Sequence, residues 1–238
     1  MSATPTNPKG LKDIPFELPQ VEPAQKRRAK RLCDALKESY PEAHCELTFS
    51  APHELLIATI LSAQCTDVAV NKATPALFKK FPTPTHYAKA KPVDIEPYVK
   101  TLGFFRNKAK SVHAAMTTVV EEFDGKIPQT MDELLSLRGV ARKTAGVVLS
   151  NAFNINVGVV VDTHVMRLSE RFGLIEEDEI GNPVKIERKL MALFPRKDWG
   201  LLSHLLIFHG RRACSARMKS CADHPVCKKF GTCCSLRD

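Results

Sequence analysis

Apolar residues recur at helical spacing along most of this chain. After Pro23, one predicted helix carries its apolar side chains on a single face, at Ala29, Leu32, Cys33, Leu36 and Tyr40. Helical segments separated by short loops follow from Ser50 onward, the first with one apolar stripe at Leu55, Leu56, Ile60 and Leu61. Strand-like alternation is nearly absent, and the β-rich stretch 157–161 is too short to indicate a sheet. The pattern predicts an all-α fold.

The segment 1–23 contains prolines at five positions and few periodic apolar residues, so we expect a flexible tail there. A basic cluster follows at Lys26, Arg27, Arg28, Lys30 and Arg31. This cluster could contact DNA or act as a nuclear localisation signal, but a solvated helix face is the favoured interpretation.

Residues 130–153 predict two helices joined by a short hairpin. Thr130 and Glu133 have the spacing of a capping box, which marks a helix start, and Gly139 ends that helix. A second helix is expected from about Arg142 to Phe153. Backbone N–H groups and the dipole at its start suit a DNA phosphate without reading base sequence.

Two residues are candidates for catalysis. Lys143 lies in the first turn of the second helix beside Arg142, where the helix dipole and the neighbouring cation favour a neutral amine. A neutral amine can attack a sugar C1′ and form a Schiff base, although a phosphate-binding surface lysine is the alternative. Asp162 precedes a helical segment as a natural N-cap, and its carboxylate could also accept a proton from Lys143.

The net charge and the placement of the cysteines indicate which kinds of partner and cofactor this chain can bind. The chain carries 35 Lys and Arg against 26 Asp and Glu, a formal charge of +9 that favours a polyanion. The sequence shows neither a membrane-spanning run nor a secretion signal, so a cytoplasmic location is expected, where clustered thiols bind metal more often than they form disulfides. Four cysteines, Cys214, Cys221, Cys227 and Cys233, therefore predict a [4Fe–4S] cluster; zinc is disfavoured because close C-x2-C pairs are missing.

Taken together, these residues resemble the endonuclease III family of DNA glycosylases. The resemblance rests on LSAQCTDVAVNKAT (61–74), TLGFFRNKAK (101–110), LRGVARKTAGVVL (137–149), VDTHVMR (161–167), HGRRAC (209–214) and the terminal cysteines. It implies a six-helix domain at 46–155, an iron–sulfur domain at 24–45 plus 156–238, and a DNA-binding cleft between these two lobes. It also implies a bifunctional glycosylase and abasic-site lyase that acts as a monomer on damaged or abasic double-stranded DNA, with oxidised pyrimidine as the family's default lesion.

The resemblance assigns roles to individual residues. Lys143 matches the Schiff-base lysine and Asp162 the catalytic aspartate, whereas Gln64 and Phe104 match side chains that fill the gap left by an extruded base. Asp67 and His164 match positions that line the cleft. Together with the hairpin, the resemblance implies DNA contacts at Gln64, Phe104, Arg138, Gly139, Val140, Ala141, Arg142 and His164.

Some positions depart from the family pattern. Arg138 stands where a proline is usual and Ala141 where a glycine is usual, and Ala141 is expected to restrict the backbone and crowd the DNA. His224 occupies the place of the third cluster cysteine, so Cys227 and Cys233 are expected to take over, with Cys234 or His224 as alternatives. We expect reduced or altered activity; a lyase with weak base excision and a non-catalytic DNA-binding protein are the remaining interpretations.

Overall fold

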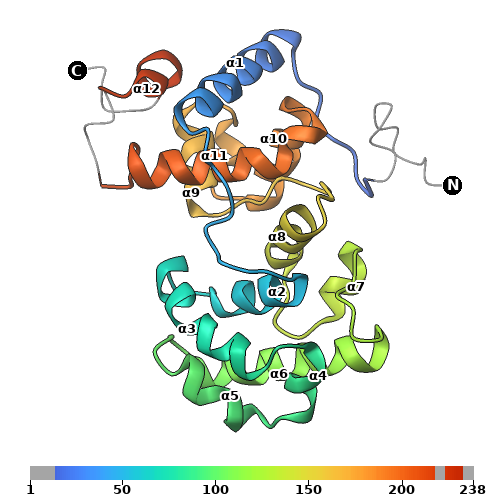
Figure 1. Ribbon diagram of the computed structural model, residues 1–238. Coiled ribbons are helices and arrows are strands. Elements are labelled where there is room, and N and C mark those ends of the chain that lie inside the picture. The colour runs from blue at the N-terminus through green and yellow to red at the C-terminus, as the bar shows by residue number, and fades with distance from the viewer. Residues whose placement is uncertain (1–13, 218–222, 233–238) are drawn as a thin grey trace, which may run out of the picture. The chain divides into compact units, whose positions relative to one another are not determined.

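The computed structural model describes residues 14–217 and 223–232. Within that part every regular element is a helix, which confirms the predicted all-α fold (Figure 1). No helix among these residues is long and apolar enough to cross a membrane. The chain divides into two compact units, with boundaries at His44/Cys45 and Ile155/Asn156. We call residues 45–155 the central unit and the remaining described residues the terminal unit.

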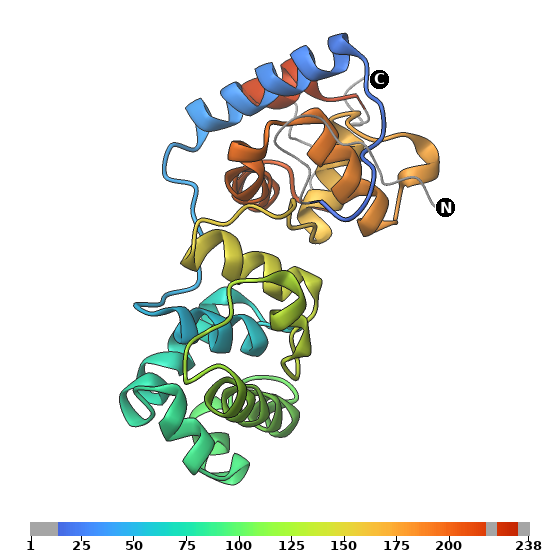
Figure 2. The same ribbon diagram turned by 90° about the vertical axis from the view of Figure 1, so that its right-hand side faces the viewer.

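The central unit contains seven helices, one more than the six expected. They are α2 (Pro52–Leu61), α3 (Asp67–Lys80), α4 (Pro84–Lys89), α5 (Pro92–Val99), α6 (Phe105–Glu122), α7 (Met131–Ser136) and α8 (Arg142–Ala152). The additional helix is α4, whose six residues are too few for a periodic pattern to be visible in the sequence. Its start signal is Pro84 at the first helical turn. Both α4 and α5 pack along α6 (Figure 2).

Helix α2 forms the centre of this unit. All seven residues from Leu55 to Leu61 are buried, so the single apolar stripe predicted for this helix is wrong. The helix contacts α3, α6 and α8 and therefore has little surface left for solvent. The buried hydroxyl of Thr59 is satisfied because it donates a hydrogen bond to the Leu55 carbonyl at 2.7 Å.

The terminal unit is built from segments at both ends of the chain. Its helices are α1 (Pro23–Ser39), α9 (Thr163–Arg171), α10 (Pro183–Leu193), α11 (Trp199–Arg212) and α12 (Pro225–Phe230), with 3-10 turns η1 (Glu177–Glu179) and η2 (Arg196–Asp198). Helix α11 packs against both α1 and α9 (Figure 1). Trp199, at the start of α11, is fully buried, and its indole N–H donates to the Phe194 carbonyl at 2.9 Å.

Helix α1 buries the face that the sequence predicted, including Leu32 and Leu36. Most of its basic cluster is exposed, as expected of a solvated helix face. Arg28 is the exception: its guanidinium is half-buried and donates to the carbonyls of Phe172 and Phe230, at 2.7 Å each. This arginine therefore joins α1 to the end of α9 and to the end of α12.

The second part of the predicted flexible tail is packed. Ile14 is only 5% exposed, and Phe16, Leu18 and Val21 lie against the same core cluster. The guanidinium of Arg188 lies over the Phe16 ring, 4.5 Å from its centroid. The flexibility expected from the prolines is therefore wrong for residues 14–22, because their apolar side chains find partners in the terminal unit; residues 1–13 lie outside the described part.

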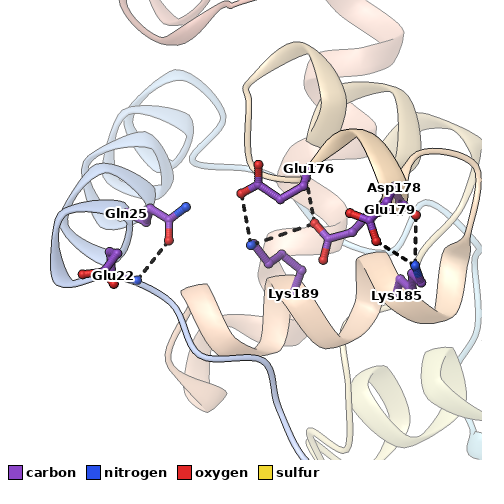
Figure 3. A network of polar contacts seen from close by, with 7 residues as sticks. All are labelled: Glu22, Gln25, Glu176, Asp178, Glu179, Lys185 and Lys189. Carbon is purple, nitrogen blue, oxygen red and sulfur yellow. Dashed lines mark hydrogen bonds and ion pairs between the residues drawn. The ribbon is translucent and has the colours of Figure 1, made fainter.

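A polar network holds η1 against α10 (Figure 3). The ammonium of Lys189, whose side chain is 8% exposed, lies 3.3 Å from a Glu176 carboxylate oxygen and 3.9 Å from one of Glu179. Glu179 also accepts the backbone N–H of Glu176 at 2.7 Å, while Lys185 pairs with Asp178 at 2.8 Å. The buried charge of Lys189 is thereby compensated, as a buried ammonium requires.

Candidate functional site

The predicted helix–hairpin–helix is present in the central unit. The Thr130 hydroxyl accepts the Glu133 N–H at 3.4 Å and donates to the Glu133 carboxylate at 2.7 Å, which caps the start of α7. The turn that follows is closed by a hydrogen bond from the Val140 N–H to the Leu137 carbonyl at 3.1 Å. Val140 is buried and its only hydrogen-bond donor, the backbone N–H, is used within the turn, so this residue has no further donor to offer a phosphate.

Gly139 is required by both its torsion angle and its surroundings. Its φ of +83° lies in the left-handed region that glycine adopts without cost. A Cβ atom at this position would lie 2.9 Å from the Cβ atom of Ser111 and 3.7 Å from a methyl group of Ile60. The hairpin is therefore held directly against α6 and α2.

Lys143 is the second residue of α8 and is exposed. Its amine projects from the helix turn whose leading N–H groups lack intrahelical acceptors. Ala141, the N-cap, has φ −97° and ψ 169°, an extended conformation that any residue adopts. The expected torsional restriction by Ala141 is therefore wrong. Arg138 is exposed in the hairpin before it.

Gln64 and Phe104 share an unusual backbone conformation. Their φ angles are +55° and +56°, in the left-handed region that side chains other than glycine rarely occupy. Phe104 is also 67% exposed, more than any other large hydrophobic residue of the described chain. An exposed aromatic ring on a strained backbone is typical of a functional position.

These two residues meet the hairpin at one pocket of about 230 Å³, lined by Ile60, Ala63, Gln64, Phe104, Asn107, Lys108, Ser111 and Gly139. Three of the residues assigned to DNA contact, from three separate segments, therefore face the same cavity in the central unit.

Lys108 and Cys65 form a further pair at this location that no sequence motif indicated. Lys108 is 5% exposed, and its ammonium donates a hydrogen bond to the Cys65 sulfur at 2.9 Å. Burial raises the pKa of Cys65, but the hydrogen bonds from Lys108 and from the Gly103 backbone, together with the charge of Lys108, lower it, and the net shift is downward. No local sequence signal links two residues 43 positions apart.

Asp162 and His164 belong to the terminal unit, whereas Lys143 belongs to the central unit. Asp162 is the N-cap of α9, and one carboxylate oxygen accepts the N–H groups of His164 and Val165 at 2.8 Å each. The His164 ring nitrogen Nδ1 lies 3.1 Å from the Arg167 guanidinium. A Cβ atom on Gly210 would lie 2.8 Å from the same nitrogen, so this ring packs tightly against α11.

A group of metal-ligating residues lies between α11 and α12. The ligand atoms of His209, Cys214 and Cys227 are buried and all lie within 4.8 Å of one another. An Arg171 N–H donates to the Cys214 sulfur at 3.0 Å, which favours the thiolate form that binds metal. The other predicted ligands, Cys221 and Cys233, and the alternative Cys234 lie outside the described residues.

His224, the other alternative ligand, is engaged elsewhere. Its Nδ1 accepts the Val226 N–H at 3.3 Å, and its Nε2 lies 3.2 Å from the Tyr40 hydroxyl. The residue that sequence reasoning missed is His209, whose Nε2 lies 3.1 Å from the Cys227 sulfur. Burial, followed by the charge of His224, lowers the pKa of His209 to about 3, which keeps its ring neutral. Its position in HGRRAC, five residues before Cys214, was the available signal.

Several known proteins are similar to this chain in sequence and in structure. Residues 57–196 match the HhH-GPD superfamily of base excision DNA repair proteins. Endonuclease III of Synechocystis is 51% identical over 84% of this chain and 90% of its own length, and that of Escherichia coli K12 is 38% identical over 82% and 91%.

Solved structures agree with these relatives. A trapped covalent intermediate of endonuclease III with DNA superposes with a TM-score of 0.80 at 38% identity, over 87% of this chain and 95% of the other. A thermostable thymine-DNA glycosylase, at 19% identity and a TM-score of 0.78 over 88% and 97%, shares the fold. The chain therefore belongs to the endonuclease III family of base excision repair enzymes, DNA glycosylases that also act as abasic-site lyases.

Proposed function

We propose that this protein excises oxidised pyrimidines from double-stranded DNA and then nicks the strand, using Lys143 as the nucleophile. The observation that carries the proposal is the position of Lys143 in the first turn of α8, directly after the helix–hairpin–helix turn. Nucleophilic attack requires a neutral amine, so Lys143 needs a proton acceptor. The protein acts as a monomer in the cytoplasm, where its net positive charge favours binding to DNA.

The reaction proceeds in two stages. Asp162 accepts a proton from the Lys143 amine, which attacks the sugar C1′; the base departs with the electrons of its glycosidic bond. The C1′–O4′ bond of the sugar then breaks, O4′ takes up a proton, and nitrogen forms an imine with C1′ that acidifies the neighbouring C2′ position. Loss of a C2′ proton expels the 3′ phosphate by β-elimination, and hydrolysis of the imine releases Lys143. The product is a single-strand nick.

The pocket beside the hairpin supports DNA binding at the same surface. Phe104 and Gln64 are the side chains that would enter the base stack once the damaged nucleotide is extruded, and they partly offset the cost of unstacking. Arg138 and Arg142 would contact phosphate without reading sequence, and the half-buried His164 would contribute from the terminal unit. Lysine and arginine contacts of this kind make affinity salt-dependent.

We also propose that Cys214, Cys221, Cys227 and Cys233 hold a [4Fe–4S] cluster. Two observations support this donor set: the Cys214 and Cys227 sulfurs are buried close together, and an arginine N–H donates to one of them. His209 lies near enough to orient the Cys227 thiolate or to replace a cysteine ligand. Such a cluster would organise the basic chain between α11 and α12 for DNA contact and would take no part in base excision.

Borohydride trapping on a duplex with one oxidised thymine tests the proposal. Borohydride reduces a Schiff base to a stable amine, so the wild-type protein should become covalently attached to the labelled strand. Lys143→Ala should abolish the adduct, whereas Lys89→Ala, which removes an exposed lysine on α4, should leave it unchanged.

Repeating the assay on an abasic duplex separates the alternatives. An adduct on abasic DNA alone would indicate a lyase that no longer excises bases. Absence of any adduct, with DNA affinity retained, would indicate a protein that only binds DNA. An adduct that persists in Lys143→Ala would show that another amine is the nucleophile and would refute the assignment.

A further inference from the structure

The Cys65 sulfur connects the two turns that carry Gln64 and Phe104. Cys65 lies between α2 and α3, directly after Gln64. Its sulfur accepts hydrogen bonds from the Gly103 backbone, directly before Phe104, and from the Lys108 ammonium in the first turn of α6. One sulfur atom therefore joins two strained turns at the rim of the pocket.

Lys108 makes this sulfur electrostatically unusual. Its side chain is buried, and the hydrogen-bond partner of its ammonium among the described residues is the Cys65 sulfur, with no carboxylate in ion-pair range. A buried ammonium without a counter-charge is unfavourable, because it has lost its hydration and gained no opposite charge. Ionisation of Cys65 supplies the missing negative charge, so the pair favours a thiolate.

Other cysteines of the same chain provide a contrast. Cys45 is half-buried like Cys65, but burial raises its pKa, and burial raises the pKa of Cys33 to about 11. The downward shift of the Cys65 pKa distinguishes it from both. Because thiolates rather than thiols are nucleophilic, partial exposure together with a cationic neighbour is the environment of a reactive cysteine.

We infer that Cys65, paired with Lys108, is a site of reversible oxidation by hydroperoxides. The thiolate sulfur attacks one peroxide oxygen, an S–O bond forms, and the O–O bond breaks. Sulfur is oxidised to a sulfenic acid, and the peroxide is reduced to hydroxide, or to alkoxide for an organic hydroperoxide, which is then protonated. A thiol later restores the cysteine through a mixed disulfide.

The added oxygen changes the contacts of the sulfur with Gly103 and Lys108, and the neighbouring turns with them. Resting on the proposed function, in which Gln64 and Phe104 contact DNA, this modification lowers affinity for duplex DNA. A protein that repairs oxidised bases would thereby lose DNA affinity reversibly under the oxidant that produces its substrate.

The test treats the purified full-length protein with hydrogen peroxide in the presence of dimedone, which adds only to sulfenic acids. Peptide mass spectrometry then compares Cys65 with Cys45, another cysteine of the central unit that is partly exposed. We expect several-fold more adduct on Cys65, because a lowered pKa leaves more of this thiol ionised at neutral pH. Equal labelling of the two cysteines would overturn the proposal.

Two further measurements keep the outcome clear. Lys108→Met should reduce labelling of Cys65. Because Lys108 is buried, circular dichroism is used to check that this variant is folded. Alkylation by iodoacetamide at neutral pH needs no variant. Wild-type Cys65 should react several-fold faster than Cys45, and equal rates would contradict the thiolate.

DNA binding is then measured before and after peroxide, in the wild type and in Cys65→Ser. Peroxide should weaken binding by the wild type several-fold and leave the variant unaffected. Labelled Cys65 with unchanged affinity would overturn the effect on binding. A protein that binds no DNA before oxidation would instead refute the proposed function, whatever the labelling shows.

Discussion

The carboxylate of Asp162 accepts the backbone N–H of Val165 at 2.8 Å and closes the first turn of α9. The same oxygen also accepts the N–H of His164 at 2.8 Å. The residue proposed to activate Lys143 is therefore also a structural cap. Any substitution of Asp162 changes two properties, and the two must be separated experimentally.

Asparagine and alanine separate these roles. Asparagine caps helices about as well as aspartate, so Asp162→Asn should unfold at nearly the wild-type temperature, whereas Asp162→Ala should lose about 0.5–2 kcal/mol of unfolding free energy. Both should lose about 10²–10⁴-fold in single-turnover base excision, because neither accepts the proton. Wild-type excision by Asp162→Asn would mean that Asp162 only caps the helix.

Phe104 should contribute to binding at the expense of stability. Asparagine tolerates a positive φ better than phenylalanine does, so Phe104→Asn should raise the free energy of unfolding by up to about 1 kcal/mol. The same change should weaken binding to a damaged duplex, measured by fluorescence anisotropy. Val93→Ala, which trims another exposed apolar residue of the central unit, is the control and should change neither quantity. Unchanged affinity in Phe104→Asn would remove Phe104 from the DNA interface.

Gly139 and Gly125 form a matched pair for the hairpin. Both have positive φ, +83° and +73°, but a Cβ atom would meet Ser111 at Gly139 and nothing within 4 Å at Gly125. Gly125→Ala should cost about 1–2 kcal/mol from torsional strain alone, and Gly139→Ala should cost more. Only Gly139→Ala should also weaken DNA binding. Equal losses in a urea titration would show that the contact with Ser111 relaxes freely.

His204 should make the protein sensitive to acid. Burial, followed by the charge of His44, lowers the pKa of His204 to about 4. Below pH 6.5 the unfolded chain therefore binds a proton that the folded chain does not, so stability falls as pH drops from about 6.5 to about 4. His204→Gln should remove up to about 3 kcal/mol of this loss in urea titrations at several pH values. His86→Gln, at an exposed position, should retain the wild-type pH profile.

The cysteine ligands can be assigned by iron content. A [4Fe–4S] protein contains about four iron atoms per chain. Cys214→Ser and Cys227→Ser should purify with less iron than this, whereas Cys45→Ser should retain the full amount. Cys233→Ser and Cys234→Ser, compared side by side, should show iron loss in the first only. Iron retained in Cys227→Ser but lost in His209→Asn would instead favour histidine ligation.

Much of the local structure was predictable because neighbouring residues determine it. The apolar spacing of α1, the capping pair Thr130 and Glu133, and the glycine of the hairpin all act within a few positions of one another. The same local patterns did not predict the short helix α4 or the burial of the central helix α2. Helix α4 is too short to display a period, and α2 is buried on all sides, so its apolar residues form no stripe.

The all-α class, the helical hairpin and the candidate catalytic residues Lys143 and Asp162 could be predicted from local sequence patterns. Three other features became visible only in the folded chain: Gln64, Phe104 and Gly139 share one pocket, Ile14 is packed, and His209 lies beside the cysteines. The pair of Lys108 and Cys65 belongs to the same group. Helix periods and caps depend on residues a few positions apart, whereas these contacts depend on how distant segments pack and on which buried charges then need partners.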